Sequence, residues 1–452
     1  MSALLNPDQI VYTDTSFKPC IVKRLLGSGG QGEVYCALRQ DVPVALKWYF
    51  PHQATVEQRR AIQTLIRFGP PNNRFLWPME MVSIPGKPGF GYLMPLRDPR
   101  CKSIIDLMKR RAEPSFHTLI TACIELTHSF LQLHSKGLCY RDVSFGNVFF
   151  NVETGAILIC DNDNVAINGE KRSGVMGTPR FMAPEVVRDE ADPDTQTDLF
   201  SLSVLLFYLL LVHHPLEGEK ENEIKCLDFV AMKRLYGENP LFIFDPKDSS
   251  NFPVIGLHDN AIIFWNLYPR NIRRLFTRAF TEGLHHPERR VRESEWRSAL
   301  GVLRDSIIVC ECGEENFHCP EKSADRNGNP GLCWSCNQLL TVPLSLKAGR
   351  SRVMLNPNTC LYRFHLTGMG SYDFTEPIGR MNQNPMNPSQ WGIKNMTQSD
   401  WTMLTPEGSA RTVPPGKSFP LEAGVKVDFG ETVGEIIEEY FDWQDARLAA
   451  CA

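Results

Sequence analysis

Apolar and polar residues alternate along much of the first hundred positions, which is the pattern of short, partly buried β-strands. A glycine-rich stretch over 27–33 joins two of these segments. One helical pattern follows, in which Ile62, Leu65 and Ile66 share a face before Gly69. The strands are expected over 20–26, 34–39, 43–50 and 91–96. These residues predict a small sheet-rich lobe with one helix, over about 15–96.

Helical patterns dominate the chain from 97 to about 306. A long amphipathic helix is expected over 114–137, and a largely helical region begins at 197. Two short strands are expected between them, over 147–151 and 156–160. The most apolar segment, 199–212, is too short to cross a bilayer and favours a buried helix. Strands first and helices later indicate an α+β fold of two lobes.

The character of the chain changes again after residue 306. A cysteine-rich segment, 307–341, precedes short alternating runs broken by Pro, Gly and Asn. Such runs are typical of an all-β domain, expected over 342–437 as a small β-sandwich, with 438–452 as a tail. The chain is thus expected to hold a two-lobed domain over 1–306, a cysteine-rich module and a β domain.

The composition is that of a globular protein without a strong charge bias. The formal net charge is -4, which argues against a nucleic-acid-binding protein because those are usually basic. The opening residues carry neither the basic start nor the long apolar run of a signal peptide. Scattered cysteines without such a leader are expected to be reduced. The sequence therefore favours a cytoplasmic protein that does not enter a membrane.

Three glycines mark the first stretch with candidate chemistry, "LLGSGGQGEVY". Gly27, Gly29 and Gly32 form the pattern G-x-G-x-x-G, and glycine lets backbone N–H groups approach phosphate oxygens closely. The pattern also fits an ordinary turn or a dinucleotide-binding loop. That loop should lead into a helix, whereas this one leads through Val34 into a strand. A hairpin with Lys47 on the following strand fits a loop that covers nucleotide phosphates.

Lys47 needs an acidic partner if its ammonium group is to be held against the α- and β-phosphates. The helical stretch that follows offers only Glu57, ten residues away, so Glu57 is the expected partner. The alternatives are a solvated glutamate on the helix and an ordinary surface lysine on the strand.

A second group of polar residues follows the long helix. Asp142 and Asn147 lie five positions apart in "YRDVSFGN", and Asp161 ends the apolar run "LIC". The carboxylate of Asp161 and the amide oxygen of Asn147 are suited to Mg²⁺, and Asp142 suits the acceptance of a hydroxyl proton. Asp163, two residues after Asp161, is either a further ligand or a loop residue.

The stretch "GTPRFMAPE", 177–185, is the most specific in the chain. Glu185 within it is expected to be buried and to need a cationic partner, for which Arg290 is preferred to Arg292. Asp198 follows at the start of the apolar helix.

Over 18 to about 305 the chain resembles the eukaryotic-like serine/threonine protein kinases. The matching positions are Gly27, Gly29, Gly32, Lys47, Arg141, Asp142, Asn147, Asp161, 177–185 and Asp198. The resemblance implies a two-lobed phosphotransferase that uses ATP with Mg²⁺ or Mn²⁺ and acts on Ser or Thr of a protein substrate. It also implies that Thr178 lies beside the catalytic Asp142.

Three positions depart from the family pattern. Tyr140 replaces a histidine, Ser144 replaces a lysine that helps to neutralise the γ-phosphate, and "DND" at 161–163 replaces D-F-G. Losing one cation would cost roughly 10²–10³ in rate. An active kinase is expected, because the four residues Lys47, Asp142, Asn147 and Asp161 remain. A nucleotide-binding pseudokinase that recruits partners is the rival, and a small-molecule kinase is disfavoured by 177–185.

Four segments resemble a bacterial kinase subgroup more narrowly, namely 140–150, 159–169, 177–185 and 197–218. Kinases of that subgroup belong to phosphorylation triads associated with tellurite resistance and stress. The resemblance implies two partners, a von Willebrand factor A-type protein and a PPM-type protein phosphatase, and a role with autophosphorylation in bacterial signalling. Arg141 suggests control by phosphorylation of the activation segment, with Ser173 and Thr178 as candidate acceptors.

Five cysteines fall between 310 and 336. Cys333 and Cys336 have the C-x-x-C spacing that lets two thiolates chelate one zinc ion, and Cys310 and Cys312 form a tighter pair upstream. A structural zinc ribbon with these four ligands is expected, since four thiolates leave no open position. Cys319 is the substitute if the tighter pair does not chelate, and reduced structural cysteines are the alternative.

The β domain resembles forkhead-associated (FHA) domains in three segments, 378–383, 391–403 and 418–430. The resemblance implies binding of phosphothreonine peptides. Arg380 and Asn395 are the candidate contacts, and two ordinary turn residues are the alternative.

Overall fold

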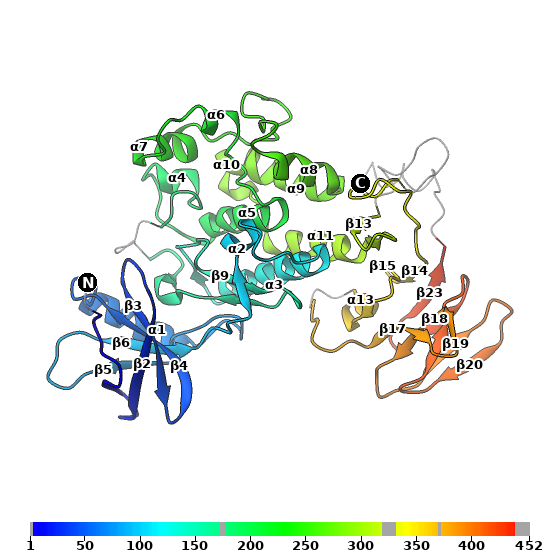
Figure 1. Ribbon diagram of the computed structural model, residues 1–452, viewed down its shortest axis with the longest axis horizontal. Helices are drawn as coiled ribbons and strands as arrows, with labels where there is room; N and C mark the ends of the chain where they lie inside the picture. Colours follow the sequence, from blue (N-terminus) through cyan, green and yellow to red (C-terminus); the bar gives the residue numbers. More distant parts are fainter. Residues whose placement is uncertain (1–2, 171–176, 319–330, 369–371, 439–452) are drawn as a thin grey trace. The chain divides into compact units, whose positions relative to one another are not determined.

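A computed structural model describes residues 3–170, 177–318, 331–368 and 372–438 of the chain (Figure 1). The chain divides into two compact units. The first holds 1–114, 125–259 and 276–293, and the second holds 115–124, 260–275 and 294–452. Helices with residues in both units are α3 (Phe116–Ser135), α8 (Asp259–Leu267), α9 (Arg270–Phe280) and α11 (Glu293–Asp305).

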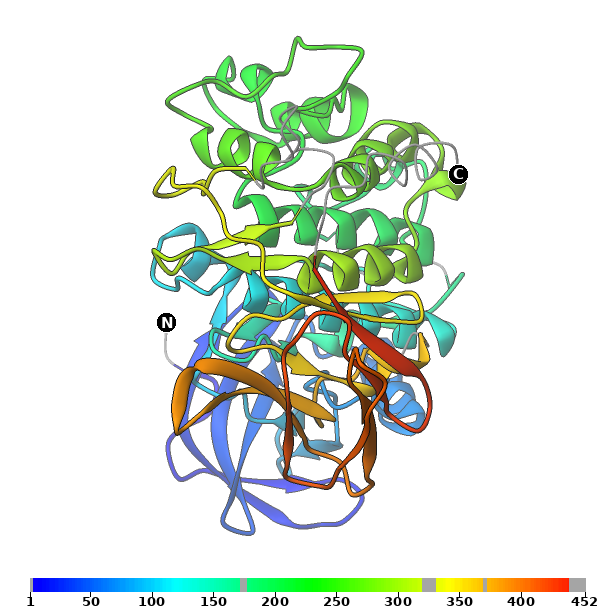
Figure 2. The ribbon, with the colours of Figure 1, turned by 90° about the vertical axis from the view of Figure 1, so that its right-hand side faces the viewer.

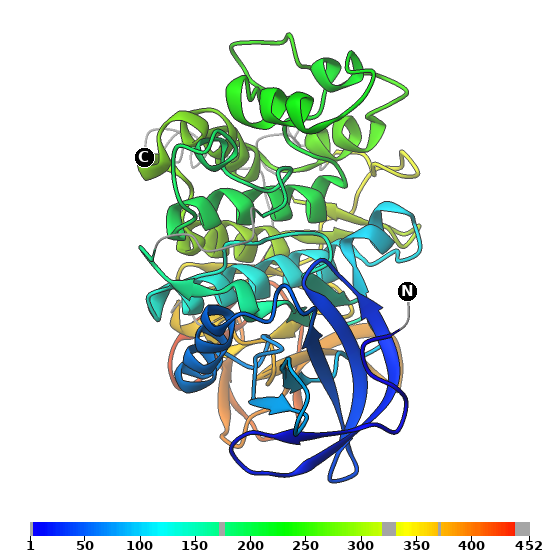
Figure 3. The same ribbon diagram turned by 90° about the vertical axis from the view of Figure 1, so that its left-hand side faces the viewer.

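Six strands at the start of the first unit close into a barrel in the order β1-β2-β3-β4-β6-β5 (Figure 3). They are β1 (Ile10–Thr13), β2 (Pro19–Ser28), β3 (Gly32–Arg39), β4 (Val42–Tyr49), β5 (Glu80–Ser83) and β6 (Gly91–Pro95). The sequence predicted β2, β3, β4 and β6. It missed β1 and β5, because strands of four residues carry too few positions for a periodic signal. These two strands pair with each other and close the barrel around Val22, Tyr35 and Leu46.

Helix α1 (Val56–Phe68) follows β4 and has clear start and stop signals. The Thr55 side chain accepts a hydrogen bond from the N–H of Gln58, and Gly69, at φ +68°, ends the helix. Ile62 and Leu65 are buried, so one apolar stripe of α1 faces the interior.

Helix α5 (Thr195–Leu211) is the core helix of the first unit. A capping box of Asp194 and Thr197 starts it, and it is buried from Thr197 to Leu211. A helix that is apolar on all sides belongs in a protein core, which confirms the interpretation of this segment. Within the described residues, no helix is long and apolar enough to cross a membrane.

Short elements complete the first unit, and the ends of β8, β9 and β10 lead into the candidate catalytic residues. The elements are β7 (Cys101–Ser103), α2 (Ile104–Met108), β8 (Leu138–Cys139), β9 (Val148–Asn151), β10 (Ile157–Ile159), η1 (Asn162–Asn164), β11 (Ala166–Ile167), α4 (Pro184–Val187), α6 (Glu219–Asn222), α7 (Phe229–Met232), η2 (Lys233–Glu238), α10 (Glu282–His285) and η3 (Pro287–Arg289). Strand β9 pairs with β7 and β10, and β8 pairs with β11.

The second unit contains a strand-rich region after residue 342, as the alternating pattern predicted (Figure 2). One sheet has the order β15-β14-β23-β22-β19-β20 and the other β16-β17-β18-β21. Leu346, Ile393, Trp401 and Val427 share one core between the sheets, which is the arrangement of a β-sandwich. The elements of this part are β12 (Ile307–Val309), β13 (Glu315–Phe317), β14 (Ser345–Ala348), β15 (Ser351–Met354), β16 (Cys360–Leu361), α13 (Arg363–Thr367), β17 (Gly379–Asn384), β18 (Asn387–Asn395), β19 (Trp401–Leu404), β20 (Ala410–Val413), β21 (Ser418–Pro420), β22 (Lys426–Asp428) and β23 (Val433–Ile437).

Aromatic residues around α13 pack on the end of α11 within the second unit. The Arg304 guanidinium lies 4.2 Å from the ring centroid of Phe374 and 5.5 Å from that of Tyr362. Gly301 makes room for the ring of Tyr372, since a Cβ at position 301 would lie 2.5 Å from that ring. These contacts fix the segment before the β-sandwich on the helix.

Arg380 and Asn395, the candidate peptide contacts, lie in different environments. Arg380 on β17 is exposed, whereas Asn395 at the end of β18 is fully buried. The Asn395 amide donates to the carbonyls of Ser399 at 2.8 Å and Val413 at 3.0 Å, and its oxygen accepts from the N–H and hydroxyl of Thr397. All of these partners lie inside the domain, so Asn395 holds the turn between β18 and β19.

Replacing Asn395 with Ala removes the donor from two carbonyl groups, at about 1–3 kcal/mol for each buried unsatisfied group. We expect hydrogen–deuterium exchange in β18 to β20 of the intact chain to become at least about tenfold faster. Gln398→Ala, at an exposed position of the same turn, is the matched control. Equal protection in the two variants would contradict a structural role for Asn395.

Candidate active site and cysteine cluster

A cavity of about 820 Å³ opens in the first unit. Its lining includes Gly27, Gly29, Gly32, Val34, Ala45, Lys47, Met94, Asp142, Phe149, Asp161 and Asn164. Apolar side chains are thus combined with a lysine and two carboxylates. A cavity of this size and mixed character suits a small ligand with both an apolar ring and charged groups.

The glycine-rich loop is the turn of the hairpin between β2 and β3, as the order of strands predicted. Gly27 pairs with Val34 in the ladder, and the Gly29 N–H donates to the Gly32 carbonyl. A Cβ at Gly32 would lie 2.2 Å from the Trp48 carbonyl oxygen, so only glycine fits there. Gly27 and Gly29 face open space, which leaves their backbone accessible to a ligand.

The Lys47 ammonium group is the centre of the charged part of the site. Its Nζ lies 2.7 Å from Asp163 Oδ2 and 3.1 Å from Asp161 Oδ1, and it donates to Gln31 Oε1 at 3.0 Å. Burial by itself would lower the pKa of Lys47, but the carboxylates of Asp163 and Asp161 outweigh it and the pKa is raised. Lys47 is therefore charged at neutral pH.

The structure does not bring Glu57, the partner expected from the sequence, to Lys47. Glu57 is exposed on α1, and within the described residues the carboxylates paired with Lys47 are those of Asp161 and Asp163. Successive helix residues point about 100° apart, and the neighbour Gln58 is the one that faces inward. Its amide donates to the Asp163 carbonyl at 3.4 Å. Within the described residues, the carboxylates that pair with Lys47 thus come from outside α1.

Asp142 and Asn147 are joined through their shared loop. The Asn147 amide donates to the Asp142 carbonyl at 2.6 Å, and the Asn164 amide donates to Asp142 Oδ2 at 3.2 Å. Burial, followed by the negative charges of Asp161 and Asp163, raises the pKa of Asp142 to about 6. A carboxylate with such a pKa accepts a proton more readily than an ordinary one and is still ionised at neutral pH.

Asp161 has the exposure that a metal ligand needs. Its side chain is 46% exposed and lines the cavity, and its backbone is left-handed at φ +52°. Such a conformation is costly outside glycine and is often found at functional sites. Asn147 is buried behind the lining and makes no hydrogen bond through its amide oxygen within the described part of the chain. Both oxygens are of the type that Mg²⁺ and Mn²⁺ prefer, so the two residues fit such an ion.

Tyr140 links the loop that carries Asp142 to the segment between β10 and Asp161. Its hydroxyl donates to the Cys160 carbonyl. Asp198 accepts the N–H of Tyr140 at 2.5 Å and the N–H of Arg141 at 3.1 Å. The replacement of histidine by Tyr140 therefore preserves a connection between the two catalytic segments.

His134 on α3 supports Asp198 from the other side. It contacts Asp198 Oδ2 at 3.1 Å and also binds Glu293. Burial would lower the pKa of His134, but its hydrogen bonds to Asp198 and Glu293 raise it to about 9. The stabilisation from this charge is complete below the ordinary pKa of about 6.5 and is lost as pH rises through about 9.

Arg141 does not supply the charge that a lysine at Ser144 would have given. Its Nη2 donates to the Glu170 carbonyl at 2.7 Å. The described cationic residues that line the cavity are Arg24, Lys47 and Arg97. The Arg97 guanidinium stacks over Phe149 at 4.2 Å. Lys47 is thus the cation that contacts the acidic pair.

The segment 177–185 is held in place by its last residue. Arg290 pairs with both carboxylate oxygens of Glu185 at 2.8 Å, which confirms the preference for Arg290. The Thr178 carbonyl accepts the N–H of Phe181, and the described residues show no hydrogen bond from Thr178 to Asp142. Ser173 lies outside the described residues.

Residues 86–272 match the protein kinase domain family. Over 260 residues the chain is 27% identical to the DNA damage-responsive serine/threonine-protein kinase RqkA of Deinococcus radiodurans, covering 55% of this chain and 36% of that protein. It is 28% identical over 210 residues to the serine/threonine-protein kinase PknL of Mycobacterium tuberculosis, covering 44% of this chain and 51% of that protein. It is 29% identical over 129 residues to the serine/threonine-protein kinase plk-2 of Caenorhabditis elegans, covering 27% of this chain and 19% of that protein. Residues 86–272 are thus similar to a protein kinase domain, and the chain is similar to proteins named as serine/threonine-protein kinases.

The kinase domain implies the two-lobed fold, with the strand barrel as one lobe and the helices around α5 in the other. Asp142, Asn147, Asp161 and the segment 177–185 lie within the matched residues, whereas the glycine-rich loop and Lys47 precede them. The chain spans between 19% and 51% of the length of these three relatives, less than two thirds of each.

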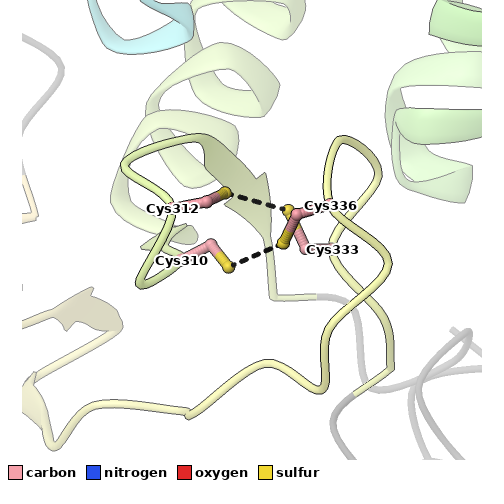
Figure 4. A group of neighbouring side chains, drawn as sticks. All are labelled: Cys310, Cys312, Cys333 and Cys336. Atoms are coloured by element: carbon pink, nitrogen blue, oxygen red, sulfur yellow. Dashed lines mark hydrogen bonds between the residues drawn. The ribbon is translucent and has the colours of Figure 1, made fainter.

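Beyond the kinase domain, four cysteines bring their thiols together (Figure 4). Cys310 and Cys312 lie in the turn after β12, and Cys333 and Cys336 come from a second loop. The sulfur atoms lie within 4.8 Å of one another, with Cys310 and Cys336 3.6 Å apart and Cys312 and Cys333 3.8 Å apart. Four sulfurs bound about 2.3 Å from zinc would lie about 3.8 Å apart, so the cluster fits a tetrahedral ion. Cys319 lies outside the described residues.

Residues beside the cysteines pack on helices of the second unit. Asn316 donates to Cys333 Sγ at 3.4 Å, and the N–H of Trp334 donates to the Asn316 oxygen at 3.1 Å. Glu315 accepts the N–H of His117 at the start of α3 at 2.8 Å. These contacts tie the cysteine cluster to the first turn of α3.

Sequence reasoning missed the amide side chains that connect the site. Gln31 accepts a hydrogen bond from Lys47 and donates to the Asn164 oxygen at 2.9 Å, and Asn164 in turn contacts Asp142. Neither amide belongs to a spacing motif. The second aspartate of "DND", Asp163, is a local signal, since the sequence allows it as a further ligand or as a loop residue.

The raised pKa of Asp142 predicts the acidic limb of activity. Asp142 accepts a proton only when ionised, so kcat/KM for ATP, measured with a generic protein acceptor, should rise with pH, reach half of its maximum near pH 6 and level off about one pH unit higher. Asn164→Ala removes a hydrogen bond that lowers this pKa, and the limb should move to higher pH. A limb near pH 4, or a shift in the opposite direction, would contradict the assignment.

Proposed function

We propose that this protein transfers the γ-phosphoryl group of ATP, with Mg²⁺ or Mn²⁺, to a Ser or Thr hydroxyl of a protein substrate. The observation that carries the proposal is that Lys47, Asp142 and Asp161 line one cavity beside the glycine-rich loop. The matched kinase domain and the named relatives support it.

The residues have separable roles in this reaction. The backbone of Gly27 and Gly29 covers the phosphates, with Val34 beside them, and Lys47 contacts the α- and β-phosphates. Asp161 and Asn147 would hold the metal ion, which when bound neutralises charge on the phosphates. Asp142 accepts the hydroxyl proton as the bond from phosphorus to the substrate oxygen forms and the bond to the β-phosphate oxygen breaks.

A nucleotide-binding pseudokinase that recruits partners is the second candidate. The observation that favours it is Ser144, because the kinase pattern has at this position a lysine that helps to neutralise the γ-phosphate. The intact set of Lys47, Asp142, Asn147 and Asp161 favours transfer.

The wider role that we propose is bacterial signalling with autophosphorylation. A von Willebrand factor A-type protein and a PPM-type protein phosphatase are the proposed partners, in a system associated with tellurite resistance and stress. The support is the resemblance of segments 140–150, 159–169, 177–185 and 197–218 to that kinase subgroup. Thr178 is the described candidate for the phosphorylated residue of the activation segment.

For the β-sandwich we propose an FHA-like role in binding a phosphothreonine peptide. Arg380 supports this role, since it is an exposed cation on β17. Asn395 supports it only as a scaffold residue, because its partners are internal.

For the cysteine cluster we propose a structural zinc ribbon formed by Cys310, Cys312, Cys333 and Cys336. The tetrahedral spacing of the sulfurs and the hydrogen bond from Asn316 to Cys333 support it.

Transfer is tested with the purified chain, labelled ATP and Mg²⁺, and a generic Ser/Thr acceptor. We expect label on the acceptor or on the chain itself, and about 10²–10⁴-fold less with Asp142→Asn. Asp248→Asn, an exposed aspartate, is the matched control. A chain that binds ATP with Mg²⁺ but transfers no more label than Asp142→Asn would favour the pseudokinase.

The zinc ribbon predicts about one zinc ion per chain. A chelator should release it, lower the melting temperature and change the fluorescence of Trp334, which adjoins Cys333. Cys312→Ser should lose the metal, and Cys226→Ser, at an exposed cysteine outside the cluster, should keep it. Retention of zinc by Cys312→Ser would contradict the four-thiolate site.

A further inference from the structure

The two carboxylates on Lys47 differ in their surroundings. The Asp161 side chain is 46% exposed and lines the cavity, whereas the Asp163 side chain is fully buried and is absent from the lining. Lys47 therefore pairs with the accessible carboxylate of Asp161, which lines the cavity, and with the buried carboxylate of Asp163, which does not. The closer contact, 2.7 Å, is the one with Asp163.

Asp163 is itself held by neighbours from β4 and α1. Its Oδ2 accepts the Tyr49 hydroxyl as well as the Lys47 ammonium group. The Gln58 amide donates to the Tyr49 hydroxyl at 3.1 Å and to the Asp163 carbonyl at 3.4 Å. The inward position on α1 thus carries an amide, and the acidic group comes from the segment after β10.

We infer that Asp163 is the positioning residue that holds Lys47 against the nucleotide phosphates, a role that sequence analysis placed on Glu57 of α1. The inference rests on the proposed function, since it concerns the same nucleotide site. Asp161 is the candidate metal ligand, so its charge is shared when a metal ion is bound. The Asp163 carboxylate, which does not line the cavity, then keeps its ion pair with the buried Lys47.

In this arrangement, Lys47 is oriented by the segment after β10 and not by a carboxylate of α1. Asp163 lies two residues from Asp161, so one short segment carries both the carboxylate that holds Lys47 and the one that faces the cavity. Helix α1 contributes through the neutral Gln58, whose hydrogen bonds orient Tyr49 and the Asp163 backbone. The position of Lys47 consequently does not require a carboxylate on α1.

The test compares the binding of ATP with Mg²⁺ and the binding of adenosine to the full chain. Asp163→Asn removes the fixed charge behind Lys47, and we expect about 100-fold lower kcat/KM for ATP and at least about tenfold weaker ATP binding. Adenosine makes no phosphate contact, so its affinity should change less than about threefold. A loss that is equal for both ligands would indicate general damage to the cavity and would overturn the inference.

Two double variants separate the loss of the Asp163 charge from other effects of the Asp163→Asn substitution. Lys47→Met removes the group through which Asp163 acts, so Lys47→Met/Asp163→Asn should bind ATP within about threefold of Lys47→Met alone. Gln58→Glu/Asp163→Asn returns a carboxylate from α1 and should recover at least about tenfold of the lost ATP affinity. If the losses of ATP affinity from Lys47→Met and Asp163→Asn add up in the double variant, the inference is overturned.

Glu57→Gln tests the competing assignment directly. An ATP-affinity loss equal to that of Asp163→Asn would return the role to Glu57. Nucleotide binding is measured without turnover, so these outcomes are distinguishable from failure of the proposed function. A parent chain that binds ATP but transfers no phosphate would refute phosphoryl transfer. The role of Asp163 would still be decided by the ATP affinities of the same variants.

Discussion

A buried ammonium group needs a charge partner where it lies, and the arrangement of the candidate active site follows from this requirement at Lys47. Lys47 contacts carboxylates on two sides and the Gln31 amide on a third. Gln31 continues to Asn164, and Asn164 to Asp142. Lys47 thereby links the glycine-rich loop, the segment after β10 and Asp142 through one chain of contacts. The same carboxylates raise the pKa of Asp142 to about 6, after burial.

The contacts of Tyr140 and Asp163 show what two of the departures from the kinase pattern do in this chain. Tyr140 differs from histidine in shape, but its hydroxyl still donates to the carbonyl before Asp161. Asp163 replaces a glycine and supplies a carboxylate that α1 does not. Each of these two residues thus makes a direct contact within the candidate active site. Ser144 is the departure for which the described residues show no cation in its place, and the described cations that line the cavity are Arg24, Lys47 and Arg97.

The sequence predicted the elements and residues that carry a local signal. The hairpin around the glycines, the buried helix α5 and the pair of Glu185 and Arg290 all followed from periodicity or motif spacing. It did not predict partners set by the direction of a side chain. Glu57 and Gln58 are neighbours in sequence, yet only Gln58 faces inward. Asn395 likewise has the type of a peptide-binding residue, and only its four internal hydrogen bonds identify a turn anchor.

The cysteine-rich segment takes part in the packing of α3. Glu315 accepts the N–H of His117 in the first turn, where a negative charge stabilises the helix dipole. Phe116 in the same turn lies 5.3 Å from Phe317 and 6.1 Å from Trp334, ring centre to ring centre. The helix that these residues anchor continues for 20 residues to the turn that carries His134, which supports Asp198 beneath the catalytic loop. The cysteine-rich segment therefore contributes, through Glu315 and Phe317, to the packing around the first turn of α3.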